Sequence, residues 1–154
     1  MLDLFAAAIG GELASLATVQ ALVGDGSAEA RVWLDGSGVA AALIYLWLSP
    51  AGVRALAEGR FDGREPDRAH LGRAHASAGV YAWACAGAGL EGRRAVMRAW
   101  AELKAGAFAR LPFFARAATP AGRKALIERL HCLPVDETGG LLWAAPVHAP
   151  RRAA

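Results

Sequence analysis

Residues 85–94, with the sequence CAGAGLEGRR, place three closely spaced glycines next to two arginines. The pattern predicts a strand before this segment and a helix after it. Amides at a helix N-terminus have no partner within the helix and lie at the positive end of its dipole. Glycines let a phosphate approach the backbone closely. The positive charges of Arg93 and Arg94 are unfavourable at the positive end of a helix dipole, but they favour a bound anion. We therefore expect a phosphate-binding loop, with a tight strand-to-helix turn as the alternative.

The same glycines, Gly87, Gly89 and Gly92, also satisfy the G-x-G-x-x-G fingerprint of dinucleotide-binding proteins. That fingerprint normally follows the first strand of a parallel sheet and has an acidic residue about 20 positions further on. Here the loop lies past the middle of the chain, and the next strand offers Arg116 instead of an acid. Dinucleotide binding is therefore the weaker interpretation.

Several other side chains have types that could do chemistry. Cys85 adjoins the loop, where a helix N-terminus could lower its pKa, although a small buried strand residue is the alternative. A general base would come from an acid or a histidine, although a solvated surface charge is the simpler interpretation of each candidate. The candidates are Glu91, Glu58, His70 and His75. The two histidines have no nearby cysteine to complete a zinc site, so no metal is expected.

The chain before the loop predicts helices and a hairpin. Apolar residues repeat every three or four positions from Leu2 to Val19, which indicates a helix that Gly10-Gly11 weakens and can split. Residues 29–34 and 39–48 predict two strands joined by a tight turn at Asp35-Gly36-Ser37-Gly38. Ser49-Pro50 is a typical helix start, and Gly59 a typical stop.

The middle of the chain predicts a surface connection over residues 60–79, with a short helix begun by Asp67. Beyond it, the pattern alternates between strands and helices. The expected elements are strand 80–86, helix 91–104, strand 113–118, helix 121–130 after Thr119-Pro120, and a hairpin of strands 131–135 and 141–147.

This order predicts an α/β fold: a mixed, mostly antiparallel twisted sheet with a central parallel strand pair, flanked by helices. Residues 1–150 would form a single domain and residues 151–154 a disordered tail. Two aromatic pairs, Tyr45/Trp47 and Tyr81/Trp83, each share a strand face. They indicate either an aromatic-walled cleft or ordinary packing under helices.

Composition restricts the location and the partners. The chain has 154 residues and a mean hydropathy of +0.28, but its longest strongly apolar stretch, residues 39–48, is half of a membrane span. It has no basic leader, so a cytoplasmic location is expected, without a membrane partner. The chain has 17 basic and 14 acidic residues, so its excess of positive charge is small. Nucleic acid is therefore not expected as a partner. Cys85 and Cys132 are expected to be reduced.

From Val80 onward, the chain resembles the GNAT acyltransferase superfamily, whose members transfer an acyl group from coenzyme A to an amine. The resemblance rests on strand 80–86, the loop and helix 87–104, strand 113–118, the segment ARAATPAGRKALIERLHCLPV (115–135) and the closing hairpin. The hairpin 31–48 fits the strands that precede the central strand of that fold. This sequence departs from the family pattern in two places: no Gln or Arg stands ahead of the glycines, and Ile127 stands where a general-acid tyrosine is common.

The resemblance implies a function and a set of site residues. An acyl-CoA, such as acetyl-CoA, would be the co-substrate, and a small-molecule or peptide amine the acceptor, with Glu91 as the candidate base. The pantetheine arm would pair with the backbone of Trp83, Ala84, Cys85 and Ala86. The pyrophosphate would accept hydrogen bonds from the amides of Gly87, Gly89 and Gly92. Arg93 and Arg94 would face the phosphates. The alternative is a GNAT-shaped binding or partner protein without catalysis. An edge-strand homodimer is a further expectation.

Overall fold

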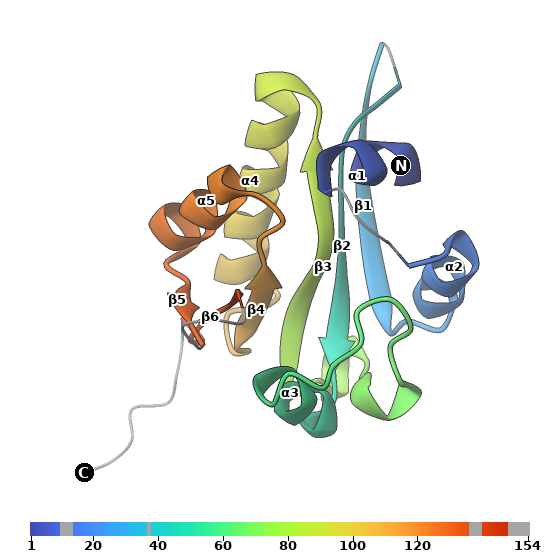
Figure 1. Ribbon diagram of the computed structural model, residues 1–154, viewed down its shortest axis with the longest axis vertical. Helices are drawn as coiled ribbons and strands as arrows, with labels where there is room; N and C mark the ends of the chain where they lie inside the picture. Colours follow the sequence, from blue (N-terminus) through green and yellow to red (C-terminus); the bar gives the residue numbers. More distant parts are fainter. Residues whose placement is uncertain (10–13, 37, 136–139, 148–154) are drawn as a thin grey trace.

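The computed structural model describes residues 1–9, 14–36, 38–135 and 140–147, and shows an α/β fold built on a six-stranded mixed sheet. The strand order is β1-β2-β3-β4-β6-β5, in which only β3 and β4 run parallel. Helices lie on both faces of the sheet (Figure 1). The predicted fold class is therefore confirmed at this level. The strand bounds are β1 Ala28–Asp35, β2 Gly38–Leu48, β3 Gly79–Gly87, β4 Phe113–Arg116, β5 Leu133–Pro134 and β6 Leu141–Ala144.

The N-terminal helical pattern forms two helices, α1 (Leu2–Ile9) and α2 (Leu16–Gly24). The break at Gly10-Gly11 falls outside the described residues. The second helix has its own start signal, because the Ser15 hydroxyl accepts a hydrogen bond from the amide of Thr18 at 3.0 Å.

The predicted capping residues begin the later helices. The Ser49 hydroxyl accepts from the Gly52 amide at 3.1 Å and starts α3 (Pro50–Ala57). The Thr119 hydroxyl does the same for Gly122 at 3.0 Å and starts α5 (Pro120–Leu130). The short helix expected after Asp67 is the 3₁₀ turn η1 (Arg68–His70), followed by a second turn, η2 (Ala74–Ala76). Each capping hydroxyl or carboxylate satisfies an amide that the first turn leaves unpaired.

Three strands near the C-terminus are shorter than predicted. Strand β4 ends at Arg116, two residues earlier than expected, so Ala117 and Ala118 leave the sheet. In the final hairpin, β5 (Leu133–Pro134) and β6 (Leu141–Ala144) are shorter than the predicted strands 131–135 and 141–147. Strand β6 pairs with β4 on one side and with β5 on the other. The turn residues 136–139 and the tail 148–154 lie outside the described residues.

Two hydrophobic cores occupy the two faces of the sheet. Helices α1, α2 and α3 cover one face, where Phe5, Leu22, Ile44 and Leu46 are buried. Helices α4 (Gly89–Ala105) and α5 cover the other, where α4 contributes Val96, Ala99, Trp100 and Leu103. None of the helices in the described parts has the length and apolarity needed to cross a bilayer.

The aromatic pairs separate onto these two faces. Tyr45 and Trp47 are buried under α4, where both contact Phe108 edge-on. The Tyr45 hydroxyl and the Trp47 indole donate to the two carboxylate oxygens of Glu29, at 2.5 and 3.1 Å. This pair is therefore part of the core packing and not the wall of a cleft. Tyr81 lies in the core on the opposite face.

Candidate functional site

The most open part of the sheet lies between β3 and β4. These strands pair only at Val80–Phe113, Tyr81–Phe114 and Ala82–Ala115. Immediately afterwards, the β2–β3 register shifts: Tyr45 opposes Ala82 and Ile44 opposes Ala84, which leaves Trp83 as an extra residue. Such a bulge bends and twists its strand, and β4 ends one residue later, at Arg116. Residues 84–86 of β3 thus keep their pairing to β2, whereas residues 83–86 have no β4 partner.

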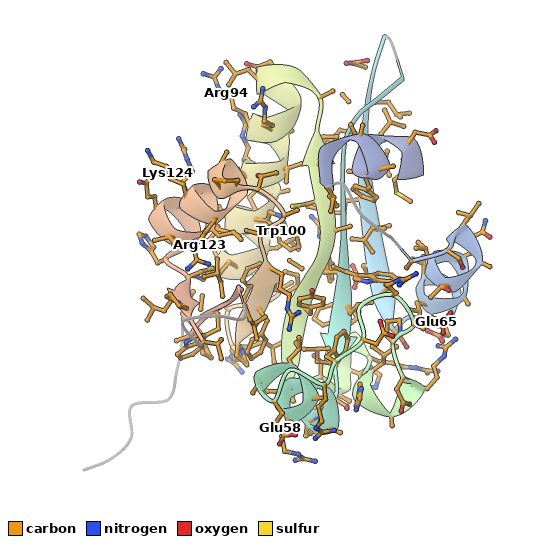
Figure 2. The ribbon with its side chains drawn as sticks, in the orientation of Figure 1. Glu58, Glu65, Arg94, Trp100, Arg123 and Lys124 are labelled. Atoms are coloured by element: carbon orange, nitrogen blue, oxygen red, sulfur yellow. The ribbon has the colours of Figure 1, made fainter. Side chains whose placement is uncertain are left out.

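A cavity of about 160 Å³ occupies this opening on the α4–α5 side. The walls come from residues 82–85 of β3, residues 115–119 and the inner faces of α4 and α5, with Ile9 of α1 at the side that faces the opposite layer. Trp100 is 1% exposed, and its indole N–H has no hydrogen-bond acceptor among the described residues. Figure 2 labels its side chain between α4 and the sheet. The indole lies close enough to the thiol of Cys85 to act on it, so this donor faces a cysteine that lines the same cavity.

Cys85 lines the same cavity. Solvent reaches the residue, yet protein surrounds it closely enough that burial raises the pKa of its thiol, an effect that the neighbouring indole of Trp100 partly offsets. The thiol is therefore protonated at neutral pH. This contradicts the expectation that the helix N-terminus could lower its pKa.

A second cavity, of about 260 Å³, lies on the α1–α2 side. Its wall is largely apolar and aromatic, with Tyr81 and Trp83 from β3. The Trp83 indole donates to the carbonyl of Gly63, which fixes the ring against the 60–79 connection. Burial raises the pKa of the Tyr81 hydroxyl, and the positive charge of Arg116 lowers it in part.

The two cavities share one stretch of wall. It consists of Ile9, Trp83, Ala84, Arg116, Ala117 and Ala118. Because one cavity lies on each face of the sheet, this shared wall places their junction at the divergence of β3 and β4. Two molecules could therefore approach one point from opposite faces.

The glycine loop has a tighter packing role than the sequence indicates. A Cβ atom at Gly87 would lie 2.2 Å from the Gly92 carbonyl carbon, and one at Gly92 would lie 2.4 Å from the Ala40 carbonyl oxygen. These two glycines let the end of β3 and the first turn of α4 pack backbone to backbone. The Gly92 amide already donates to the Ala88 carbonyl at 3.1 Å, so the expectation that it holds a phosphate is wrong.

Gly89 differs from the other two glycines. It has φ +60°, and a Cβ atom there would meet nothing within 4 Å. It begins α4, and the preceding residue, Ala88, provides no side-chain cap. In the described part of the chain, the amides of residues 89–91 have no acceptor. The amides left without an acceptor are therefore those of residues 89–91, which include Gly89 but neither Gly87 nor Gly92.

Arginines surround this end of α4. The Nε of Arg93 donates to the Gly89 carbonyl at 2.8 Å, and Arg94 pairs with Glu91 at 2.7 Å. Figure 2 shows Arg94 extending outward from the first turns of the helix. Between α4 and α5 lies a groove of about 710 Å³ whose charged lining consists of Arg93, Arg94, Arg98 and Arg129. Four guanidinium groups in one groove suit a phosphorylated ligand.

The candidate bases lie elsewhere. The carboxylate of Glu91 is 81% exposed and ion-paired, and Glu58 is exposed and paired with Arg60. His70 packs on Phe61 with its Nδ1 unpaired among the described residues, and His75 is exposed. None of the four lines the two joined cavities. Ile127 is 38% exposed and also lies outside them.

Three residues of the site were not predicted from the sequence to be functional: Arg116, Arg129 and Trp100. Arg116 carried a signal, since it follows the apolar run Phe113-Phe114-Ala115 within a predicted strand. Arg129 joins the site only through the packing of α5 on α4, which brings together residues far apart in the sequence. The unpaired Trp100 donor has no signature in sequence.

Comparisons with known proteins add no further constraint, because no protein-family model, curated protein or solved structure matches this chain.

Proposed function

We propose that this protein binds an acyl-coenzyme A and transfers its acyl group to an amine, on a GNAT-like fold. The observation that carries the proposal is the unpaired edge of β3 at residues 83–86, which leads directly to the uncapped first turn of α4. Coenzyme A has the matching chemistry, an extended amide-containing arm followed by a pyrophosphate.

Each part of such a ligand has a complementary surface. The arm would pair with the open edge of β3 as an added strand, using main-chain hydrogen bonds. The pyrophosphate would accept from the amides of residues 89–91 at the positive end of α4. The phosphorylated nucleoside would lie toward the groove that contains Arg98 and Arg129.

This arrangement would deliver the thioester to the junction of the two cavities. The amine nitrogen would attack the thioester carbonyl carbon, forming the C–N bond as the C–S bond breaks. The nitrogen loses a proton and the departing thiolate gains one, directly or through water. With no carboxylate among the described cavity residues, the rate enhancement would come mainly from positioning and from N–H donors to the developing oxyanion.

Thermal unfolding with acetyl-CoA tests the binding step. A ligand present at about 100 times its Kd stabilises the native state by about 2.7 kcal/mol, so a saturating concentration of acetyl-CoA is expected to raise the Tm by several degrees. The double variant Arg98→Ala/Arg129→Ala should lose most of this shift. Arg54→Ala, on α3 at the other end of the molecule (Figure 1), is the control and should keep it. An unchanged Tm for the wild type contradicts the proposal.

A matched pair at Gly89 locates the phosphate. Gly89→Ala and Gly89→Glu share the same backbone strain at φ +60°, but only the second adds a negative charge beside the amides of residues 89–91. We expect acetyl-CoA to stabilise the alanine variant much more than the glutamate variant. Equal stabilisation would place the ligand elsewhere.

A binding protein without catalysis is the second candidate, because Glu91 and Ile127 lie outside the joined cavities. It predicts the same Tm shift but no N-acylated product when acetyl-CoA and amines are incubated with the protein. Dinucleotide binding has less support, because β3 and β4 are the single parallel pair among the described strands.

A further inference from the structure

We infer that the acceptor is an α-amino acid with an apolar side chain, whose carboxylate is bound by Arg116. This inference rests on the proposed acyl transfer and names its second substrate. Its basis is the cavity on the α1–α2 face, which joins the acyl-CoA opening at the divergence of β3 and β4.

The position of Arg116 follows from the alternation along β4. Phe114 packs in the core beneath α1 and α2, whereas Phe113 and Ala115 pack on the α4 side. Arg116 is two residues after Phe114, so its side chain lies on the α1–α2 face. It is close enough to Tyr81 for its charge to act on that hydroxyl. In the described parts of the chain, its guanidinium forms no ion pair or side-chain hydrogen bond.

The charges of this cavity select the sign of the ligand. The charged residues in its described lining are Arg64 and Arg116; Arg64 already takes part in another interaction, so the charge offered to a ligand is that of Arg116. A guanidinium in a partly apolar site favours a carboxylate, which it can bind through two parallel hydrogen bonds. A cationic acceptor such as a polyamine or a lysine side chain would find no opposite charge among these described residues.

The rest of the wall selects an apolar body. Around Tyr81 and Trp83, the lining consists of aliphatic and aromatic side chains: Phe5, Ile9, Val19 and Ile44. The volume of about 260 Å³ is near the lower end for small-molecule sites. A single amino acid suits this space better than a protein terminus that must continue out of it.

The location of Arg116 also determines which amines can reach the expected position of the thioester. Arg116 lines both cavities, so a carboxylate bound to it lies at their junction. An α-amine, separated from that carboxylate by one carbon atom, would then lie at the junction as well, where the thioester is expected. An amine at the far end of a long side chain would lie away from it.

A set of acceptors with the same side chain tests this inference. Purified full-length protein is incubated with acetyl-CoA and with L-phenylalanine, L-phenylalaninamide or 2-phenylethylamine, and the N-acetyl products are measured by mass spectrometry. Because a charge-assisted hydrogen bond contributes about 1.5–3 kcal/mol, the acid should exceed the two neutral analogues by about 10- to 100-fold in kcat/KM. Arg116→Gln should abolish this preference, because it should lower kcat/KM for the acid much more than kcat/KM for the amide. Arg110→Gln, an exposed arginine outside both cavities, is the control.

The outcomes separate the acceptor from the cofactor. If acetyl-CoA raises the Tm but L-phenylalanine is not acetylated, or is acetylated no faster than its amide, the acceptor inference is wrong and coenzyme A binding stands. The same holds if Arg116→Gln keeps the preference for the acid. If acetyl-CoA neither stabilises the protein nor supports transfer to any acceptor, the proposed function itself is wrong.

Discussion

Cys85 provides a chemical probe of the opening between β3 and β4. It lines the α4–α5 cavity and is reached by solvent, whereas Cys132, the other cysteine in the sequence, is 1% exposed. Its backbone belongs to the open edge of β3 on which the pantetheine arm would lie. Alkylation of this thiol therefore reports on whether the opening is occupied.

Iodoacetamide should modify Cys85 slowly at neutral pH and faster as the pH rises. Burial raises the pKa of the thiol. The fraction of Cys85 present as the reactive thiolate should therefore still increase with pH in the alkaline range where an ordinary cysteine is almost fully ionised. Saturating acetyl-CoA, which has no free thiol, should slow the modification at least several-fold. Mass spectrometry measures the rate, and Cys85→Ser is the control that should remain unmodified. A rate that acetyl-CoA leaves unchanged would mean that the cofactor does not enter this opening.

At the scale of elements, the glycine loop joins β2, β3 and α4. Gly87 and Gly92 allow contacts that any side chain would obstruct, since a Cβ atom at these positions would fall 2.2 and 2.4 Å from backbone atoms, respectively. The Ala88 amide adds a hydrogen bond to the Ala40 carbonyl at 2.8 Å. The loop is thus a rigid strand-to-helix connection that holds the first turn of α4 in place.

Alanine substitution should distinguish these glycines. Gly87→Ala and Gly92→Ala force backbone atoms apart and are expected to cost more than about 3 kcal/mol of unfolding free energy, in the range of severe core substitutions. Gly89→Ala meets no atom and has only the strain of its positive φ, about 1–2 kcal/mol. Urea denaturation of the three variants measures the difference. If all three variants lose a similar unfolding free energy, close backbone packing is not the reason for glycine at positions 87 and 92.

For the whole molecule, the order of elements could be predicted from local signals. Ser49-Pro50, Thr119-Pro120 and the Asp35–Gly38 turn mark boundaries that the structure reproduces. The site was less predictable, because it depends on where two strands stop pairing. The extra residue at Trp83 and the early end of β4 leave no pattern in the sequence, because both depend on how strands from different parts of the chain pair in the assembled sheet.

The glycine fingerprint shows the same limit. Its spacing indicated a phosphate site. Spacing alone does not tell which glycine adjoins open space for a ligand and which one allows two backbone segments to pack closely. In the structure, Gly87 and Gly92 do the second, and Gly89 alone of the three adjoins open space. The arginine groove likewise needed the packing of α5 on α4 to bring Arg129 beside Arg98.

The two edges of the sheet differ in what they offer to a second copy of the chain. β1 is eight residues long and exposes Val32 and Leu34, at 44% and 74%, whereas β5 has only two residues and exposes Leu133 at 60%. A long apolar edge is a template for pairing with another strand. The homodimer expected from the sequence should therefore form through β1.

Light scattering coupled to size-exclusion chromatography tests this dimer across a range of protein concentrations. The wild type should approach twice the chain mass of 16.0 kDa as concentration rises. Leu34→Lys places a charge on the long edge and should shift the protein toward monomer, because an edge lysine opposes strand pairing. Leu133→Lys makes the same change on the short edge and should leave the dimer intact. A wild type that stays monomeric at every concentration, or a dimer that only Leu133→Lys disrupts, would show that β1 is not the interface.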